Sequence, residues 1–460
     1  RKLPAAGRSL ISLKGNVTSQ STENRSKSAF VRLASRTLGI EPGEFVAVAW
    51  SFAYFFCILS SYFMLRSVRE AMAIVSGVTN IPWLFTGTFT LMLLVTPVFG
   101  WLTSKFPRRV FLPWIYYFFV ANILIFFAVF TYAQNNEISQ IWISRAFFIW
   151  LSVFNLFVVS VFWSFMADIY TRKQSRRLFG VNSAGGSTGA LIGPIATSLL
   201  VTRIGFQNLL PISAALLLLA VYCVFRLRRW VRLRDAAADS EETTAAQPAI
   251  IGGSAWAGAK QVLTQPYFAA IAFALACANF LGGATYIYMA EMVSITFDGT
   301  DRQTQVFAIM DAMINALSFI GQLLLVKHSV RRIGIGRTLA LLPLVSVIGF
   351  TLLALNPAFM IIAGLQVLRR SIGFGFTKPT TDMLYSVVSK ESKYKAKNFI
   401  ETTVYRAWDV LTSWTVRSMS GIGLSGIALV CVPIALLWSV VTIWIGREYK
   451  RRDQETSSNA

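Results

Sequence analysis

The sequence predicts an all-α polytopic membrane protein with twelve transmembrane helices in two six-helix halves. Three observations lead to this prediction. Of the 460 residues, 55% are apolar and only 14% are charged, whereas about a quarter of the residues of an ordinary soluble domain are charged. Apolar stretches of about 20 residues, the length that crosses a bilayer, recur along the chain. The longest polar interruption, 226–265, falls after the sixth stretch.

Twelve apolar segments account for the predicted spans. They cover residues 45–65, 82–102, 111–130, 141–166, 179–201, 207–225, 267–290, 304–326, 338–355, 358–377, 398–420 and 424–445. The fifth is the least hydrophobic because it carries Gly185, Gly186, Gly189 and Gly193. Glycines four residues apart allow helix backbones to approach closely, whereas a phosphate cradle needs free amides at a helix N-terminus. We therefore expect these glycines to serve helix packing.

The distribution of positive charge indicates the orientation of the spans. Lysine and arginine outnumber aspartate and glutamate by 43 to 21, which gives a net charge of +22. The excess lies in alternate connections, and the positive-inside rule places such connections in the cytoplasm. We therefore expect both termini to be cytoplasmic, in a bacterial inner membrane or, as an alternative, an organelle inner membrane. Because topology accounts for much of the charge, no nucleic-acid partner is expected.

The polar interruption also predicts the domain organisation. We expect a basic cytoplasmic tail at 1–43, an N-terminal half at 44–225, a cytoplasmic linker at 226–266, a C-terminal half at 267–446 and a C-terminal tail at 447–460. The composition of the first segment also fits an organelle transit peptide, which is kept as an alternative.

Residues for enzyme chemistry are scarce. The chain has one histidine, His328, which stands among basic residues, and its four cysteines lie far apart in apolar runs. A metal centre needs closely spaced ligands, and an acid–base enzyme needs clustered titratable groups. The sequence also lacks the Gly-x-x-x-x-Gly-Lys-Ser/Thr loop that binds nucleotide phosphates for hydrolysis. We therefore expect no enzyme, no catalytic residue, no metal site and no cofactor.

One loop resembles a known signature. Gly100-Trp-Leu-Thr-Ser-Lys-Phe-Pro-Arg-Arg109 is similar to the loop motif Gly-x-x-x-Asp-Arg-x-Gly-Arg-Arg of the major facilitator superfamily, with Ser104 in place of the aspartate and Pro107 in place of the glycine. That superfamily places two six-helix halves around an axis along the membrane normal and holds the substrate between them. The two halves of this chain also resemble each other weakly, since Asp168 and Asp382 each follow an aromatic-rich span and precede basic residues.

Charged residues inside the predicted spans are the candidate substrate site, because burying a charge in a bilayer costs at least ~2.5 kcal/mol. Arg369 and Arg370 stand about 11 residues into the tenth span, near the bilayer middle. Other charges in or beside the spans are Arg66, Arg69, Glu70, Arg145, Asp311, Glu401, Arg406, Asp409 and Arg417. Arginines exceed acids in this set, and fixed cations in a low-dielectric cleft favour an anionic substrate.

A structural interpretation of the same charges is that arginines and acids pair. Arg66 stands four residues before Glu70, and Arg406 stands three before Asp409, so each pair shares a helix face. Arg369 and Arg370 point about 100° apart on a helix. We therefore expect one of these two to face the cavity and the other to reach an acid on the eleventh span.

Several motifs resemble those of the non-mitochondrial ATP/ADP exchange carriers of plastids and intracellular bacteria. Leu65-Arg-Ser-Val-Arg-Glu70 is similar to their Leu-Arg-Asp-Thr-Lys-Asp, and Phe162-Trp-Ser-Phe165 to their Phe-Trp-Gly-Phe. Lys393-Tyr-Lys-Ala-Lys397 and Ile400-Glu401 are similar to their Lys-x-Lys-x-Lys and Ile-Asp. The resemblance implies a nucleotide carrier on a facilitator fold, in which Arg69 matches a basic residue that handles the substrate.

On these motifs the chain resembles a divergent member of that group. Asn155 is the polar residue nearest to the family's acid in the fourth helix, and Gly282 replaces the acid in the seventh. Where the family has a lysine in the tenth helix, this chain has Thr381, with Lys378 and Asp382 beside it. Because two acids are missing, we expect this branch to exchange ATP for ADP poorly and a smaller anion better.

The sequence therefore predicts a secondary active transporter that works by alternating access and exchanges an anionic solute, either a nucleotide or another phosphorylated metabolite. The candidate substrate-binding residues are Arg69, Asn155, Arg369, Arg370, Lys378, Asp382, Arg406 and Asp409. The alternatives are a proton-coupled facilitator that carries a non-nucleotide organic anion, and a channel, which would need rings of repeated charges. The expected partners are the anionic solute and the lipid bilayer, and the chain is expected to be a monomer.

Overall fold

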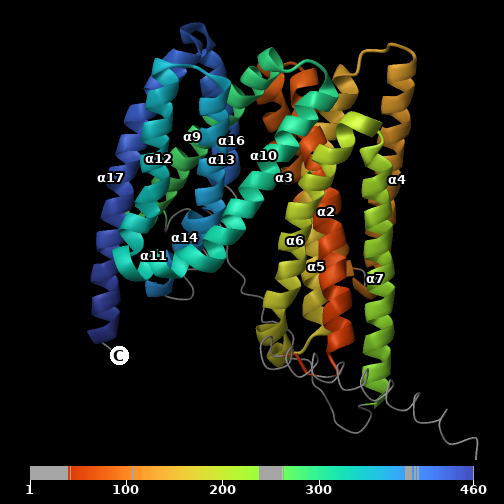
Figure 1. Cartoon of the computed structure of the whole chain (residues 1–460). Helices are drawn as coiled ribbons and strands as arrows, with labels where there is room; N and C mark the ends of the chain where they lie inside the picture. The colour runs from red at the N-terminus through yellow and green to blue at the C-terminus, as the bar shows by residue number, and fades with distance from the viewer. Residues whose placement is uncertain are drawn as a thin grey trace, which may run out of the picture.

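Long apolar helices make up the structure (Figure 1). The computed structural model describes residues 40–41, 43–105, 108–237, 262, 264–388, 396–397, 400 and 404–458, and these residues form helices and connections without any strand. The N-terminal half contains α2 (Phe45–Val75), α3 (Ile81–Lys105), α4 (Arg108–Asn135), α5 (Ile141–Ile169), α6 (Arg172–Ile204) and α7 (Leu209–Ala237). The predicted all-α fold with two halves is confirmed.

The C-terminal half contains the remaining α-helices, long and short. They are α9 (Pro266–Thr296), α10 (Thr300–Ile320), α11 (Val326–Ile333), α12 (Ile335–Leu355), α13 (Phe359–Ile372), α14 (Lys378–Leu384), α16 (Tyr405–Ser418) and α17 (Gly423–Ser458). The π-helical turn η2 (Gly321–Leu325) joins α10 to α11, and a second π-helical turn, η3 (Gly373–Thr377), joins α13 to α14. Each half is stabilised by its own apolar core, as expected for helices that bury one face against their neighbours.

Eleven helical stretches within the described residues are long and apolar enough to cross a membrane. They coincide with all the predicted spans except 398–420, where the described helix is the 14-residue α16. This helix carries Arg406, Asp409 and Arg417, which lower its hydropathy below that of its neighbours. Among the described residues, the predicted eleventh span is therefore represented by a short, charged helix.

Several helices are longer than their apolar segments. The first predicted span ends at residue 65, but α2 continues to Val75 and its 31 residues extend over ~46 Å, more than the ~30 Å hydrocarbon core. Similarly, α7 continues past 225 to Ala237, and α17 continues past 446 to Ser458. Basic residues such as arginine have good helix propensity, so an apolar segment can end where its helix does not. The predicted domain boundaries at 225 and 446 therefore lie inside helices.

Some sequence expectations concern residues outside the described part of the chain. They are most of the predicted N-terminal tail, the centre of the linker at 238–261, Phe106 and Pro107 of the loop signature, and Lys393, Lys395 and Glu401 of the carrier motifs.

The glycines of α6 pack against α2, as the sequence predicts. A Cβ atom added at Gly189 would meet the carbonyl oxygen of Phe56 and lie 3.0 Å from the backbone nitrogen of Ser60, and one added at Gly193 would lie 2.7 Å from the carbonyl oxygen of Ser60. The two backbones are therefore too close for any side chain between them. The packing role expected for these glycines is confirmed.

We expect Gly189→Leu to prevent folding of the N-terminal half, because the new side chain would have to occupy the space of the α2 backbone. The measurement is the yield of monodisperse protein after size-exclusion chromatography. Gly180→Leu on the same helix is the matched control, since a Cβ atom at Gly180 has nothing within 4 Å. Equal yields of the two variants would contradict the close contact of α2 and α6.

Both ends of the described chain lie on one side of the molecule. Figure 1 shows the start of α2, the end of α7 and the end of α17 at the same end of the bundle, which we call the terminus side, and α10 leaning toward α6 at the opposite end, the far side. The halves are joined from the middle to the far side by hydrogen bonds between described residues. The donor and acceptor pairs are Phe206 N with Asp301 Oδ1 at 2.8 Å, Gln305 Nε2 with the carbonyl oxygen of Ser198 at 2.9 Å, and Asn315 Nδ2 with the carbonyl oxygen of Ala190 at 2.9 Å.

Candidate functional site

A central cavity of about 380 Å³ lies between the two halves. Its walls come from α2, α3 and α5 of the N-terminal half and from α9, α12, α13 and α16 of the C-terminal half. Aromatic contacts between the halves pack next to it. The rings of Phe85 and Tyr286 lie 5.5 Å apart. Those of Trp83, in the first turn of α3, and Trp414, in the last turns of α16, lie 5.0 Å apart. The Trp414 indole also donates to Thr86 Oγ1 at 3.1 Å.

The end of α2 contributes a charged stripe to the cavity. Arg66, Arg69 and Glu70 line it, while Leu65 and Val68, on other faces of the helix, are fully buried in the core of the N-terminal half. The helical period therefore aims these charges inward. Arg69 Nη2 donates to Glu70 Oε1 at 2.6 Å, and Arg66 Nε lies 3.8 Å from the same oxygen. The Arg69 guanidinium also lies 4.9 Å from the centre of the Phe148 ring, within cation–π range.

A buried carboxylate connects the two halves. Asp311 on α10 is almost fully buried and accepts a hydrogen bond from Arg370 Nη1 of α13 at 3.0 Å. Its other oxygen lies 3.7 Å from Arg66 Nε of α2. The expectation that the acid partner of Arg369 or Arg370 lies on the eleventh span is wrong, since Arg370 pairs with Asp311 on the eighth. Arg370 reaches an acid on the eighth span because α10, which carries Asp311, packs against α13 at the level of Arg370.

Arg369 has a different environment from its neighbour. Its side chain lines the cavity, and the residue is only 6% exposed. Its Nη1 donates to Thr285 Oγ1 at 3.1 Å, and its Nη2 donates to the carbonyl oxygen of Ala278 at 3.2 Å. Both acceptors are neutral, and within the described residues Arg369 forms no ion pair, while its Nε has no hydrogen-bond partner. Arg369 is therefore a buried cation without a described counter-charge.

The fifth arginine of the cavity comes from α16. Arg406 Nη1 lies 3.7 Å from Asp409 Oδ2, and both residues line the cavity. The pairing expected from their three-residue spacing is thus present. Among the residues that the structure describes, five arginines line the cavity, together with the acids Glu70 and Asp409. When Asp311 is added, because it contacts two of the arginines, five guanidinium groups face three carboxylates and leave a formal charge of +2. A site with this balance attracts a dianion.

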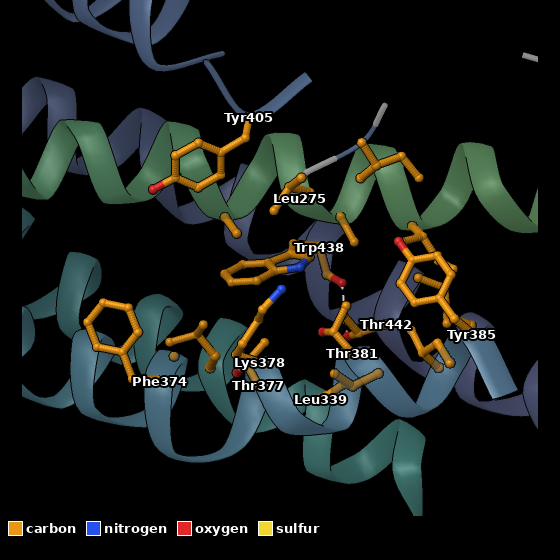
Figure 2. Close-up of a pocket in the computed structure, with 18 of the residues that line it drawn as sticks. Leu275, Leu339, Phe374, Thr377, Lys378, Thr381, Tyr385, Tyr405, Trp438 and Thr442 are labelled. Carbon is orange, nitrogen blue, oxygen red and sulfur yellow. Dashed lines mark hydrogen bonds between the residues drawn. The ribbon is translucent and has the colours of Figure 1, made fainter. Parts of the chain in front are cut away.

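A second cavity adjoins the first inside the C-terminal half (Figure 2). Its volume is about 470 Å³, and it shares Phe374, Tyr405 and Arg406 with the central cavity. Most of its wall is apolar, and Figure 2 shows the Lys378 ammonium beneath the Trp438 ring. Lys378 Nζ also lies 3.6 Å from Asp382 Oδ1. Two cations, Lys378 and the shared Arg406, in an apolar wall give this cavity a weaker anion preference than the five arginines of the central one.

The structure brings together most of the residues selected from the sequence. Those in the wall of the central cavity are Arg69, Arg369, Arg370, Arg406 and Asp409, whereas Lys378 lines the adjoining cavity. Asp382 is in the wall of neither and accepts a hydrogen bond from Lys397 Nζ at 2.7 Å. Asn155 is half-buried on α5 and lies one turn beyond Ser152, which does line the central cavity.

Other residues of the cavity were not selected from the sequence. Arg66 and Glu70 line it, and Asp311 contacts two of its arginines. All three were noted as charges in or beside the predicted spans, but the sequence did not separate them from structural pairs. Tyr286 and Gln366 also line the cavity. Because such residues are common in membrane helices, only the packing of α9 and α13 identifies them. The described residues contain no group of three or more His, Cys, Asp and Glu side chains that could hold a metal ion.

Comparisons with known proteins agree with this architecture. A family model described as Major Facilitator Superfamily matches residues 45–397. A bacterial homologue of the iron transporter ferroportin, solved in an inward-facing state, has a TM-score of 0.63 at 10% identity, over 87% of this chain and 98% of that one. The nucleoside transporter NupG has a TM-score of 0.59 at 14% identity, over 88% of this chain and 98% of that one.

A third similar structure is that of the POT family transporter PepTSo, with a TM-score of 0.56 at 13% identity, over 88% of this chain and 98% of that one. At such identities the similarity shows the fold alone. No curated protein matches the sequence.

Proposed function

The chain belongs to the Major Facilitator Superfamily and is therefore an integral, multi-pass membrane transporter, and we propose that it carries a small phosphorylated anion by exchange. Members of this superfamily alternate access to a site between their two halves. In this chain the central cavity occupies that place, between α2, α3 and α5 on one side and α9, α13 and α16 on the other.

The observation that carries the proposal is the environment of Arg369. A buried cation in a membrane protein is costly unless a counter-charge accompanies it. The polar contacts described for Arg369 are the neutral oxygens of Thr285 and Ala278, and its guanidinium lines the cavity. An anionic substrate would supply the missing charge. Arginine also suits this task because its planar donors match phosphate and carboxylate oxygens in pairs.

The charge balance supports a substrate with one phosphate. The five arginines and three acids leave +2, and a phosphate monoester carries about −1.5 to −2 at pH 7. A nucleoside triphosphate brings more charge than this cavity neutralises. Phe85, Phe148 and Tyr405 add aromatic surface on which a planar base can stack, so a nucleoside monophosphate fits the same wall. The resemblance to the ATP/ADP exchange carriers is in accord with a phosphorylated substrate and with exchange.

Counterflow in liposomes tests the proposal. Reconstituted protein should release a preloaded labelled phosphate monoester in a saturable manner when an unlabelled monoester is added outside. External ATP should drive efflux of preloaded ADP much more slowly. Fast, saturable ATP-for-ADP counterflow would contradict the proposal that the substrate has one phosphate. Exchange of non-phosphorylated carboxylates alone would contradict the proposal that the substrate is phosphorylated.

The same vesicles separate exchange from the alternatives. Exchange requires a counter-substrate and is indifferent to an imposed pH gradient. Uptake that follows a pH gradient without any counter-substrate would instead indicate the proton-coupled carrier. A flux that does not saturate with substrate concentration would indicate a channel.

A further inference from the structure

A third cavity lies on the terminus side, away from the interface of the two halves. Its volume is about 700 Å³, and it is formed by the end of α11, the first turn of α12 and the last turns of α17. In Figure 1, α17 runs along the outer edge of the C-terminal half, with α11 and the start of α12 beside its lower part. This cavity therefore faces the surroundings of the bundle and has no part in the central site.

Three cations line this cavity. Arg337 comes from α12, and Arg447 and Lys450 come from α17, against the single acid Asp453. Within the described residues these three cations form no salt bridge. The next two cations on α17 behave differently, since Arg451 Nη2 and Arg452 Nε lie 2.7 and 2.9 Å from Glu448 Oε1. The helix thus neutralises the arginines on one face and leaves positive charge on the face that lines the cavity.

The wall of the cavity changes from apolar to cationic along α17. Ile443, 41% exposed, lines it one turn before Arg447, and Lys450 follows three residues later, so one face of α17 passes from apolar to cationic. Ile333, 40% exposed, adds apolar wall from α11. An apolar wall that continues into a cationic end matches a phospholipid, which has acyl chains beside an anionic headgroup.

Two glycines in the wall of the cavity bring α12 and α17 into contact. The Cβ atom that could be built at Gly336 would lie 2.9 Å from Gly446 Cα, so α12 and α17 touch backbone to backbone. Both glycines line the cavity, and neither projects a side chain into it. The first turn of α12 also faces the cavity, and the N–H groups at the start of a helix favour an anion.

From this geometry we propose that the cavity between α12 and α17 binds the headgroup of an anionic phospholipid from the leaflet on the terminus side. Arg337, Arg447 and Lys450 contact the anionic phosphate of the headgroup, while Ile333 and Ile443 contact the upper acyl chain. The site lies at the end of the apolar segment of α17, where its sequence passes from Ile445 to Arg447, which is the depth of the headgroups. Its charge selects an anionic over a zwitterionic lipid.

The test measures lipid binding to the full chain in detergent. Purified protein is titrated with phosphatidylglycerol or phosphatidylcholine, and bound lipid is counted by native mass spectrometry, with the shift in Tm as a second readout. We expect phosphatidylglycerol to bind at least about ten-fold more tightly. In the triple variant R337Q/R447Q/K450Q this preference should disappear, since each cation near an anionic membrane surface contributes about five-fold.

A matched triple variant separates this site from general attraction by basic residues. R331Q/R332Q/R451Q removes three exposed cations on α11 and α17 that do not line the cavity, and it should keep the preference. Equal losses in the two variants, or no preference in the unaltered protein, would overturn the proposal. Soluble glycerol phosphate that displaces the lipid at the same concentration would also overturn it, because the site would then take a free phosphate. If the first triple variant fails to insert, R447Q and K450Q alone should each weaken binding about five-fold, and unchanged binding in both would reject the site.

Discussion

Arg369→Ala should abolish counterflow without lowering the stability of the empty carrier. The guanidinium is buried, lines the central cavity and contacts only neutral oxygens within the described residues, so the empty protein carries the cost of an unneutralised charge. Removing this charge should keep Tm unchanged or raise it. Transport should fall on the order of 100-fold, because a charge-assisted contact of about 3 kcal/mol with the substrate is lost. Stabilisation of the protein by added substrate should also disappear.

Two further variants define the role of Arg369. Arg369→Lys keeps the charge but lacks the planar fork, so it should restore transport only in part. Arg417→Ala on α16 removes an exposed arginine that does not line the cavity, and it should transport normally. Counterflow at the normal rate in Arg369→Ala would reject the site. A large drop in Tm of that variant would show that the guanidinium supports the fold rather than the substrate.

The sequence identified Arg369 and Arg370 as candidate residues because two adjacent arginines in the middle of an apolar segment are costly and rare. It did not identify which of them is paired. That answer depends on the approach of α10 to α13, and no local pattern in either helix records a contact between residues 59 positions apart. The same limit applies to Tyr286 and Gln366, which reach the cavity only through the packing of their helices.

The helical elements were predicted well where hydrophobicity defines them and less well where it does not. The end of α2 is an example, since Arg66, Arg69 and Glu70 continue the helix although they end the apolar run. In α16 the charged residues Arg406 and Asp409, which line the central cavity, also reduce the hydropathy by which a span is recognised. In the fifth span the glycines correctly indicated close packing, because the absence of a side chain is what allows two helix backbones to touch.

Asp311→Asn should destabilise the protein more than any other single neutralisation of an acid in the cavity. Its carboxylate contacts Arg370 in the C-terminal half and Arg66 in the N-terminal half, so the substitution removes the buried counter-charge that these two cations share. Removing one partner from a buried ion pair typically costs about 3–5 kcal/mol. The measurement is Tm in detergent, compared with Asp382→Asn. Asp382 also lies near two lysines but is 42% exposed, and its loss should cost less than about 1 kcal/mol.

A double-mutant cycle shows whether this cost comes from charge. Arg370→Gln alone should be milder than Asp311→Asn, because Asp311 keeps Arg66 at 3.7 Å and Arg66 keeps Glu70 at 3.8 Å. Combining Asp311→Asn with Arg370→Gln removes one charge of each sign, so the double variant should be more stable than Asp311→Asn alone by about 1–3 kcal/mol. Losses that simply add would mean that the two side chains do not share an ion pair. If the double variant recovers stability but not counterflow, Arg370 has two separable roles, pairing with Asp311 and binding the substrate. Restoring the charge balance of the empty carrier would then repair the first role but not the second.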